Sequence, residues 1–254
     1  MKIAVITGAS SGMGREFALR IAEKEHFDEI WLIARRADRL EQLKNKLACP
    51  ARVISMDLTE QQSFDRYKNM LSDEMPEVAM LMNCSGYGKF GRYDEISLQD
   101  KMGMIDLNVK AYVNMTELTL PYMSRGSHIV NLDSLSAFQP VPYLNVYAAT
   151  KAFILSYSRA MNAELSDRGI SVTAVCPGWV KTEFFDRAET TSNTAVTYFN
   201  HVYTPEQVIR TAIKDVYKGK DVSIHGGAIK RQVLMVKMLP HRLIMKIWLK
   251  QQKH

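Results

Sequence analysis

The sequence predicts an α/β fold, a doubly wound parallel sheet of about seven strands with helices on both faces. Two observations predict it. Short apolar runs, several of them rich in β-branched residues, alternate along the chain with longer mixed runs, an order typical of strand–helix–strand units. The chain has 254 residues, 46% of them hydrophobic, which is the size and composition of one α/β domain with a large core.

The strands follow from the apolar runs. Residues 2–7 (KIAVIT) and 30–34 (IWLIA) are largely apolar, as expected of strands buried on both faces. The predicted strands are residues 2–7, 30–34, 52–56, 78–82, 127–132, 170–176 and 221–224. Between them, the longer runs predict helices over residues 15–25, 37–47, 61–71, 98–123, 146–167 and 205–217. No second domain or internal repeat is evident, so residues 1–229 are predicted to form one catalytic domain.

A glycine-rich turn joins the first strand to the first helix. Its sequence is Gly8-Ala9-Ser10-Ser11-Gly12-Met13-Gly14. Free N–H groups and the positive end of the helix dipole suit a pyrophosphate there, and glycines let it approach the backbone. The spacing is Gly-x-x-x-Gly-x-Gly rather than the usual Gly-x-Gly-x-x-Gly of dinucleotide folds. The turn alone therefore also fits a plain strand-to-helix connection.

Tyr147 and Lys151 are the most informative pair in the chain. They stand four residues apart in a predicted helix, so their side chains share one face, one turn apart. A phenol has an ordinary pKa of about 10, and a nearby cation lowers it. The pair is therefore a candidate acid/base, although such pairs also occur by chance on many helices.

Six segments stand in the order of one known family. They are residues 7–14, Asp57, residues 83–86 (NCSG), Asn108, Ser134 with Tyr147 thirteen residues later, and residues 177–182 (PGWVKT). Through them the chain resembles the short-chain dehydrogenases/reductases, single-domain Rossmann-type oxidoreductases, over nearly its whole length. Cys84 and Ser85 depart from the family's Asn-Asn-Ala-Gly turn, and Asp133 stands where the family often has Ser.

The resemblance implies a role for each matched residue. The catalytic residues would be Asn108, Ser134, Tyr147 and Lys151. Tyr147 would donate a proton to the carbonyl oxygen, and Ser134 would hydrogen-bond the same oxygen. Lys151 would lower the pKa of Tyr147 and grip the nicotinamide ribose, and Asn108 would hold a water that feeds protons through Lys151. The cofactor-binding residues would be Gly8, Ser10, Ser11, Gly12, Met13, Gly14, Arg35, Arg36, Asp57, Leu58, Asn83, Cys84, Ser85, Gly86, Tyr147, Lys151, Pro177, Gly178, Val180 and Thr182.

The residues after the second strand favour NADP(H) over NAD(H). An acid there would bond the ribose 2′-hydroxyl, whereas Arg would neutralise a 2′-phosphate. Ala34 occupies the usual acid position and Arg35-Arg36 follows, with no acid before Asp38. The family pattern favours Arg35 for the phosphate contact. The alternative is that both arginines are merely the solvated start of a helix.

The substrate is predicted from three loops, residues 86–94, 135–146 and 183–201. They and the flanking turns carry Tyr87, Phe90, Phe138, Pro140, Tyr143, Leu144, Trp179, Phe184 and Phe185. These side chains indicate a bulky apolar ketone or secondary alcohol, such as a steroid or lipid-derived ketone, unless several of them belong to the core. The rival functions are a cofactor-binding redox sensor without turnover and a peripheral membrane enzyme that reduces lipid carbonyls.

Bulk properties narrow the class of protein. Three widely spaced cysteines, Cys49, Cys84 and Cys176, indicate reduced thiols and a cytoplasmic protein. No metal-ligand spacing occurs among the cysteines and the six histidines, and we expect no signal peptide, because the predicted first strand starts at Lys2. The resemblance implies a small-molecule substrate and a homodimer or homotetramer.

The last segment, residues 230–254, carries most of the charge asymmetry. It holds seven Lys/Arg and no acid, and without them the net charge of +6 becomes −1. The basicity therefore belongs to a tail, which argues against a nucleic-acid-binding fold. Apolar and basic residues interleave over residues 232–249, and Pro240 is expected to split the tail into two helices. Such a segment can lie on a membrane surface, but packing on the domain or a partner subunit is the preferred interpretation.

Overall fold

The computed structural model describes residues 1–188 and 195–252. Within them the chain forms one parallel sheet of seven strands in the order β3-β2-β1-β4-β5-β6-β7. The strands are β1 (Lys2–Thr7), β2 (Glu29–Ala34), β3 (Ala51–Ser55), β4 (Glu77–Asn83), β5 (His128–Leu132), β6 (Ser171–Val175) and β7 (Val222–Ser223). The strand order reverses between β1 and β4, and ligands of such sheets bind at the strand ends beside that point. The predicted fold class is confirmed.

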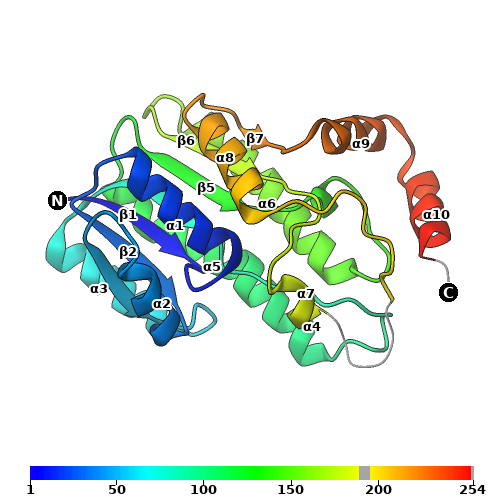
Figure 1. The fold of residues 1–254 in the computed structure, drawn as a ribbon, viewed down its shortest axis with the longest axis horizontal. Coiled ribbons are helices and arrows are strands. Elements are labelled where there is room, and N and C mark those ends of the chain that lie inside the picture. Colours follow the sequence, from blue (N-terminus) through cyan, green and yellow to red (C-terminus); the bar gives the residue numbers. More distant parts are fainter. Residues whose placement is uncertain (189–194, 253–254) are drawn as a thin grey trace.

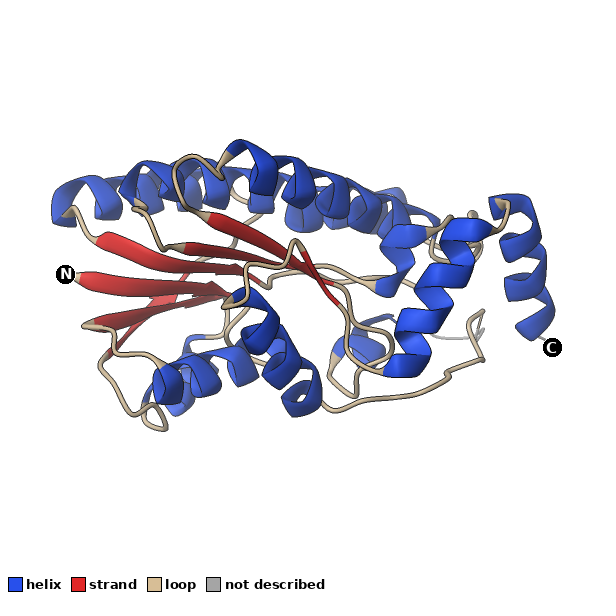
Figure 2. Ribbon diagram, turned by 90° about the horizontal axis from the view of Figure 1, so that it is seen from above, coloured by secondary structure: helices blue, strands red, loops and turns tan. Residues whose placement is uncertain are grey.

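Helices cover the sheet on both faces (Figure 2). One face carries α1 (Gly12–Lys24), α2 (Ala37–Lys44) and α8 (Pro205–Val216). The other carries α3 (Gln61–Glu74), α5 (Ala111–Thr119) and α6 (Asn145–Glu164). Each face has its own apolar core, because strands such as β1 bury side chains on both sides of the sheet.

The helix predicted over residues 98–123 is not one α-helix. The structure divides it into α4 (Leu98–Ile105), a π-helical turn (Asp106–Lys110), α5 and a 3₁₀ turn (Leu120–Tyr122). Single π-turns inside α-helices often mark functional sites, and this one contains Asn108. Pro121 lies in the 3₁₀ turn, and its missing N–H explains why the α-helix stops before it.

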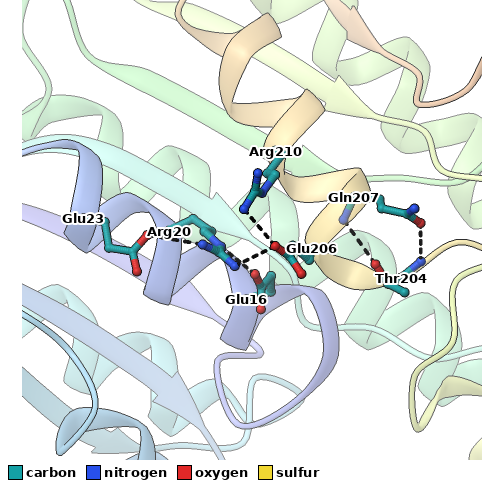
Figure 3. Close-up of polar contacts among 7 residues, drawn as sticks. All are labelled: Glu16, Arg20, Glu23, Thr204, Glu206, Gln207 and Arg210. Atoms are coloured by element: carbon teal, nitrogen blue, oxygen red, sulfur yellow. Dashed lines mark hydrogen bonds and ion pairs between the residues drawn. The ribbon is translucent and has the colours of Figure 1, made fainter.

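Polar contacts join α1, the first helix of the fold, to α8 near its end (Figure 3). The Arg20 guanidinium joins Glu16 on its own helix to Glu206 on α8, at 2.8 and 3.0 Å. Thr204 and Gln207 close a reciprocal capping box that starts α8. The ion pairs are partly exposed and each stabilises little, but they fix how the two helices lie together.

Two further helices follow the last strand, α9 (Gly227–Met238) and α10 (His241–Gln251). Pro240 separates them, as expected. Both lie beyond the carboxyl ends of the strands (Figure 1). There a third apolar cluster contains Tyr147 and is packed against Trp248 of α10. In the described part of the chain, no helix is both long and apolar enough to cross a membrane.

Polar contacts tie the tail to the body. The Trp248 indole N–H donates to the Pro142 carbonyl at 3.0 Å. The Gln252 Oε1 atom accepts from the backbone N–H groups of Thr197 and Tyr198, at 2.8 and 3.1 Å. The tail is therefore anchored to two loops of the domain at its end. The boundary at residue 230 itself stays a prediction.

Candidate active site

The turn between β1 and α1 leaves no room for side chains at two positions. Gly8 has φ +65°, and a Cβ there would lie 2.7 Å from the Cys84 carbonyl oxygen. A Cβ at Gly14 would lie 2.5 Å from the Gly8 carbonyl oxygen. Because the obstacles are backbone atoms, only glycine fits at either position. The helix α1 begins at Gly12, and its first N–H groups have no partner inside the helix. This bare helix start fits the predicted pyrophosphate site.

The end of β4 is held against the same turn. The Thr7 Oγ1 atom accepts hydrogen bonds from the backbone N–H groups of Cys84 and Ser85, at 2.9 and 3.2 Å. Asn83 is fully buried, and its amide nitrogen donates to Asn131 on β5 at 2.9 Å. The side chain of Asn83, which was predicted to bind the cofactor, therefore supports the turn from inside the sheet.

The predicted adenine end contains one buried and one partly exposed residue. Leu58 is buried and its side chain packs in the apolar core, so its cofactor contact stays a prediction. Asp57 accepts hydrogen bonds from the backbone and hydroxyl of Thr59 and pairs with Arg35 at 3.5 Å. Partial burial works to raise the pKa of Asp57, but the bonds from Thr59 and Arg35 lower it overall. Asp57 therefore stays a carboxylate that can accept a hydrogen bond.

Arg36, rather than Arg35, contacts the glycine turn. Its guanidinium donates to Ser10 Oγ at 3.2 Å and to Ser11 Oγ at 2.8 Å. It also pairs with Glu183 at 2.9 Å. Arg35 is more exposed and lies toward the Asp57 side of the site. The structure thus brings a guanidinium and two hydroxyls together beside the helix start, a donor set suited to a phosphate.

Asn108 is completely buried in the π-helical turn. Its Nδ2 donates to the Tyr87 carbonyl at 2.9 Å and to Thr150 Oγ1 at 3.1 Å, and its Oδ1 accepts from the Tyr87 backbone N–H at 3.0 Å. The side chain therefore clamps the loop after β4 to α6, the helix that carries Tyr147. The predicted water-holding role of Asn108 stays a prediction.

Tyr147, Lys151 and Ser134 meet at the carboxyl end of β5. Tyr147 and Lys151 are 9% and 3% exposed, and both lie on α6. The Lys151 ammonium donates to the Leu132 carbonyl at 2.7 Å and lies 5.8 Å from the centre of the Tyr147 ring. Ser134 hydrogen-bonds Tyr147 and caps the short 3₁₀ helix Leu135–Phe138 by accepting from the Ser136 N–H. The structure thus brings together three of the four predicted catalytic residues.

The pKa of Tyr147 is shifted opposite to the predicted direction. Burial raises it well above its ordinary value, the hydrogen bond from Ser134 lowers it, and Asp133 raises it further. The prediction of a lowered Tyr147 pKa is therefore wrong for the free protein, because desolvation of the phenolate outweighs any nearby cation. Tyr147 consequently holds its proton near neutral pH, as a proton donor must.

Asp133 is a buried acid directly behind the site. It is 2% exposed, its Oδ2 is 3.6 Å from the Cys176 sulfur, and its Oδ1 has no hydrogen-bond partner within the described residues. Burial raises the pKa of Asp133 to about 8, and the charge of Lys151 opposes that shift. Burial lowers the pKa of Lys151, and Asp133 opposes that shift in turn. The two groups therefore control each other's protonation.

The free energy of unfolding is expected to depend on whether Asp133 is protonated. The folded state raises this pKa to about 8, from about 3.9 in an unfolded chain, so folding takes up a proton between these pH values. The stability that protonated Asp133 contributes is present below about pH 4 and is lost as the pH rises through about 8. Relative to Asp133→Asn, the wild type is expected to lose up to about 1.4 kcal/mol per pH unit in that window.

In Asp133→Asn the pKa of Lys151 is expected to fall further, because no acid opposes the effect of burial. This change also makes the wild type lose stability relative to the variant as the pH rises. Urea unfolding of both proteins from pH 5 to 8 measures it. Asp94→Asn, in an exposed loop, is the matched control and should run parallel to the wild type. Parallel curves for Asp133→Asn as well would show that Asp133 is ionised throughout.

A cavity of about 460 Å³ lies over these groups. Its floor includes Ser134, Tyr147 and Lys151, and the predicted cofactor residues that line it are Met13, Cys84, Gly86, Pro177, Gly178, Val180 and Thr182. Among the predicted substrate residues, those that line it are Tyr87, Leu144, Trp179, Phe184 and Phe185. Phe90 is instead buried in the cluster behind, where its ring packs edge-on against Trp179. Of the predicted loop 183–201, residues 189–194 lie outside the described residues.

Two groups of site residues carry no motif and were missed in the sequence. Glu183 pairs with Arg36 and also with Arg39, so it joins the start of the substrate loop to the arginines after β2. Helices α9 and α10 supply Arg231, Gln232, Met235, Val236, Ile244, Ile247, Trp248 and Gln251 to the cavity wall. The apolar spacing of Ile244, Ile247 and Trp248 on one helix face was the available signal for the second group.

Comparison with known proteins finds relatives over most of the chain. The family model described as short chain dehydrogenase matches residues 2–193. A very-long-chain 3-oxoacyl-CoA reductase of Macaca fascicularis is 32% identical over 224 residues, which cover 84% of this chain and 68% of that protein.

Two solved structures share the fold over most of the chain. A short-chain dehydrogenase from Sphingobium yanoikuyae in complex with NADPH has a TM-score of 0.78 and 27% identity, covering 94% of this chain and 97% of that one. The bulky-bulky ketone specific alcohol dehydrogenase from Comamonas testosteroni has a TM-score of 0.73 and 26% identity, covering 94% and 95%.

Proposed function

The chain belongs to the short-chain dehydrogenase/reductase family, oxidoreductases of alcohol and carbonyl groups, and on that premise we propose that it interconverts a bulky apolar ketone and its secondary alcohol with NADP(H). The observation that carries the proposal is one cavity that unites the Ser134, Tyr147 and Lys151 side chains with a largely apolar wall. A polar reacting end and an apolar body of the substrate would each meet matching groups there.

The proton chemistry follows from the three side chains. Negative charge grows on the carbonyl oxygen during reduction, and donors aimed at that oxygen stabilise it. Tyr147 donates its proton to the oxygen, since burial keeps the phenol protonated. Ser134 orients the oxygen by a second hydrogen bond. The buried Lys151, close to the Tyr147 ring, favours the phenolate that remains and anchors the phenol in place.

The cofactor would supply or accept the hydride, and the turn between β1 and α1 suits a dinucleotide. Gly8 and Gly14 keep the turn bare for a pyrophosphate, next to the start of α1. Thr182 lies beside it, 3.4 Å from where a Cβ on Gly12 would stand. Arg35 and Arg36 favour a 2′-phosphate, hence NADP(H), and the NADPH bound to the Sphingobium relative is consistent with that preference.

The substrate class rests on the cavity wall. Trp179, Phe184 and Phe185 form a connected aromatic group, with ring centres 5.8 and 6.2 Å apart. The Phe184 ring also lies 5.4 Å from the ring of Tyr147, so the apolar wall reaches the proton donor. A bulky apolar substituent beside the carbonyl carbon would be buried there. The Comamonas relative, whose name gives bulky ketones as its specificity, supports this class.

A panel of ketones and secondary alcohols tests the proposal directly. Purified protein is incubated with NADPH or NADP⁺ and with NADH or NAD⁺, and the absorbance of the reduced cofactor is followed. We expect turnover to be faster with NADP(H), and kcat/KM to rise from small ketones to bulky apolar ones. Tight NADPH binding without turnover on any substrate would instead identify a redox sensor.

A further inference from the structure

The outer surface of the tail exposes large apolar side chains. Leu234, Met235 and Met238 on α9 are 60%, 51% and 76% exposed. On α10, Leu243 and Ile247, which lie one turn apart on the same side of the helix, are both more than two-fifths exposed. We call these five residues the tail face. Clustered exposed side chains of this size mark an interaction surface more often than scattered single ones.

The tail face is held rigidly to the body. The same two helices bury other side chains against the body, namely Val233 and Val236 on α9 and Ile244 on α10. Trp248 adds its hydrogen bond to Pro142, and the Lys237 ammonium lies 5.2 Å from the centre of the Phe138 ring. The exposed apolar residues therefore belong to an ordered surface with a fixed position over the cavity.

The charged side chains around the tail face are all cations. Exposed cations on the same two helices are Lys230, Arg231, Lys237, Arg242, Lys246 and Lys250. No Asp or Glu occurs in residues 230–252. Helices with apolar residues flanked by lysines and arginines suit the surface of an anionic bilayer. A second copy of the chain would bring the same cations against this face, and like charges would oppose that pairing.

The cavity opens on the same face. Met235 and Ile247 both line the cavity, and they are 51% and 42% exposed. Residues that are half exposed and also line a cavity form its rim. An apolar molecule dissolved in a bilayer under the tail face would therefore reach the cavity without crossing water.

We propose that the tail face binds the surface of anionic membranes and that the cavity takes its apolar substrate from the bilayer. The first part stands on the exposed residues and the charge alone. The second part rests on the proposed function, because it assumes that the cavity is the substrate site. The helices would lie in the interface with Leu234, Met238 and Leu243 among the acyl chains.

Vesicle sedimentation tests the first part. Full-length protein is mixed with phosphatidylcholine vesicles that contain or lack phosphatidylserine, at ~0.1 M and ~1 M salt, where the Debye length falls from about 10 to about 3 Å. We expect binding to the anionic vesicles only, and weaker binding at high salt. Replacing two cations, Arg242→Gln with Lys246→Gln, should weaken binding about 30-fold.

An apolar variant tests the role of the exposed side chains. Leu234→Gln with Met238→Gln should abolish vesicle binding, whereas Met75→Gln with Leu98→Gln, equally exposed but far along the chain, should leave it unchanged. Unchanged melting temperature in each variant shows that the fold survives. Equal binding of all variants, equal binding to neutral vesicles, or a loss of self-association instead of vesicle binding would overturn the proposal.

Turnover of a small water-soluble ketone separates the two proposals. The Leu234→Gln/Met238→Gln variant should keep the wild-type rate on cyclohexanone without vesicles, because those two side chains do not line the cavity. With decanone supplied in anionic vesicles, the variant should be slower than wild type. An inactive wild type that still binds vesicles would refute the proposed function alone. An active wild type that binds no vesicles would refute the membrane proposal alone.

Discussion

Replacing Tyr147 with Phe is expected to lower kcat by about 100-fold or more while the Kd for NADPH stays nearly unchanged. The ring of Tyr147 is buried against Phe184, with ring centres 5.4 Å apart, and Phe retains that packing. Only the hydroxyl is lost, and with it the proton donor. Steady-state rates with NADPH and a bulky ketone, together with a fluorescence titration of NADPH, measure both quantities.

Tyr157→Phe is the matched control, since Tyr157 lies on the same helix and its hydroxyl contacts Glu117 outside the cavity. It should keep the wild-type rate. The raised pKa of Tyr147 also predicts the pH dependence of the reverse reaction. Alcohol oxidation needs the phenolate, so its rate should increase as the pH rises above neutrality. A Tyr147→Phe enzyme that retains more than about a tenth of the rate would exclude Tyr147 as the general acid.

Removing a guanidinium after β2 is expected to change cofactor selectivity. Arg35→Ala and Arg36→Ala should each weaken NADPH binding by about 1.5–3 kcal/mol, the range for hydrogen bonds to a charged group. That corresponds to roughly 10- to 150-fold in Kd. Arg36 should show the larger loss, because it already lies against Ser10 and Ser11. Binding of NADH, which lacks the 2′-phosphate, should barely change.

Glu183 provides a second check on the same site. It pairs with Arg36 in the free protein, so a 2′-phosphate would have to displace it. Glu183→Gln should therefore tighten NADPH binding slightly and leave NADH unaffected. Arg66→Ala, whose guanidinium bonds the Ser55 carbonyl on the far side of β3, serves as the control. Equal losses for NADPH and NADH in Arg36→Ala would identify Arg36 as structural.

The fold was predictable because its signals are local. Most strands are short, largely apolar runs bounded by glycine, proline or polar residues, so strand and helix order follows from short windows. The interruption of the helix at Asp106–Lys110 was not predictable, since no residue there forbids an α-helix. Its π-turn accompanies the contacts of Asn108 with Tyr87 and Thr150, which are long-range.

Some features of the site were likewise predictable from short segments of the sequence, and others were not. Residue types and spacing alone indicated the pair Tyr147 and Lys151, because two residues four apart in a helix share one face. Ser134 became a candidate only through the family resemblance, whose spacing from Ser to Tyr it matches. The glycine turn was likewise visible, as were the two arginines that follow the second strand. These features depend on chemistry that each short segment carries by itself.

Only the tertiary structure decided how those groups behave. Burial, which no short segment determines, raises the pKa of Tyr147, against the prediction from its spacing to Lys151. Burial also lowers the pKa of Lys151. The contact between Arg36 and Glu183 joins residues far apart in the chain. The tail forms one wall of the cavity because its side chains contact loops that are distant in the sequence, as Trp248 does with Pro142. Its exposed side chains are mostly apolar or basic and form a surface beside the cavity.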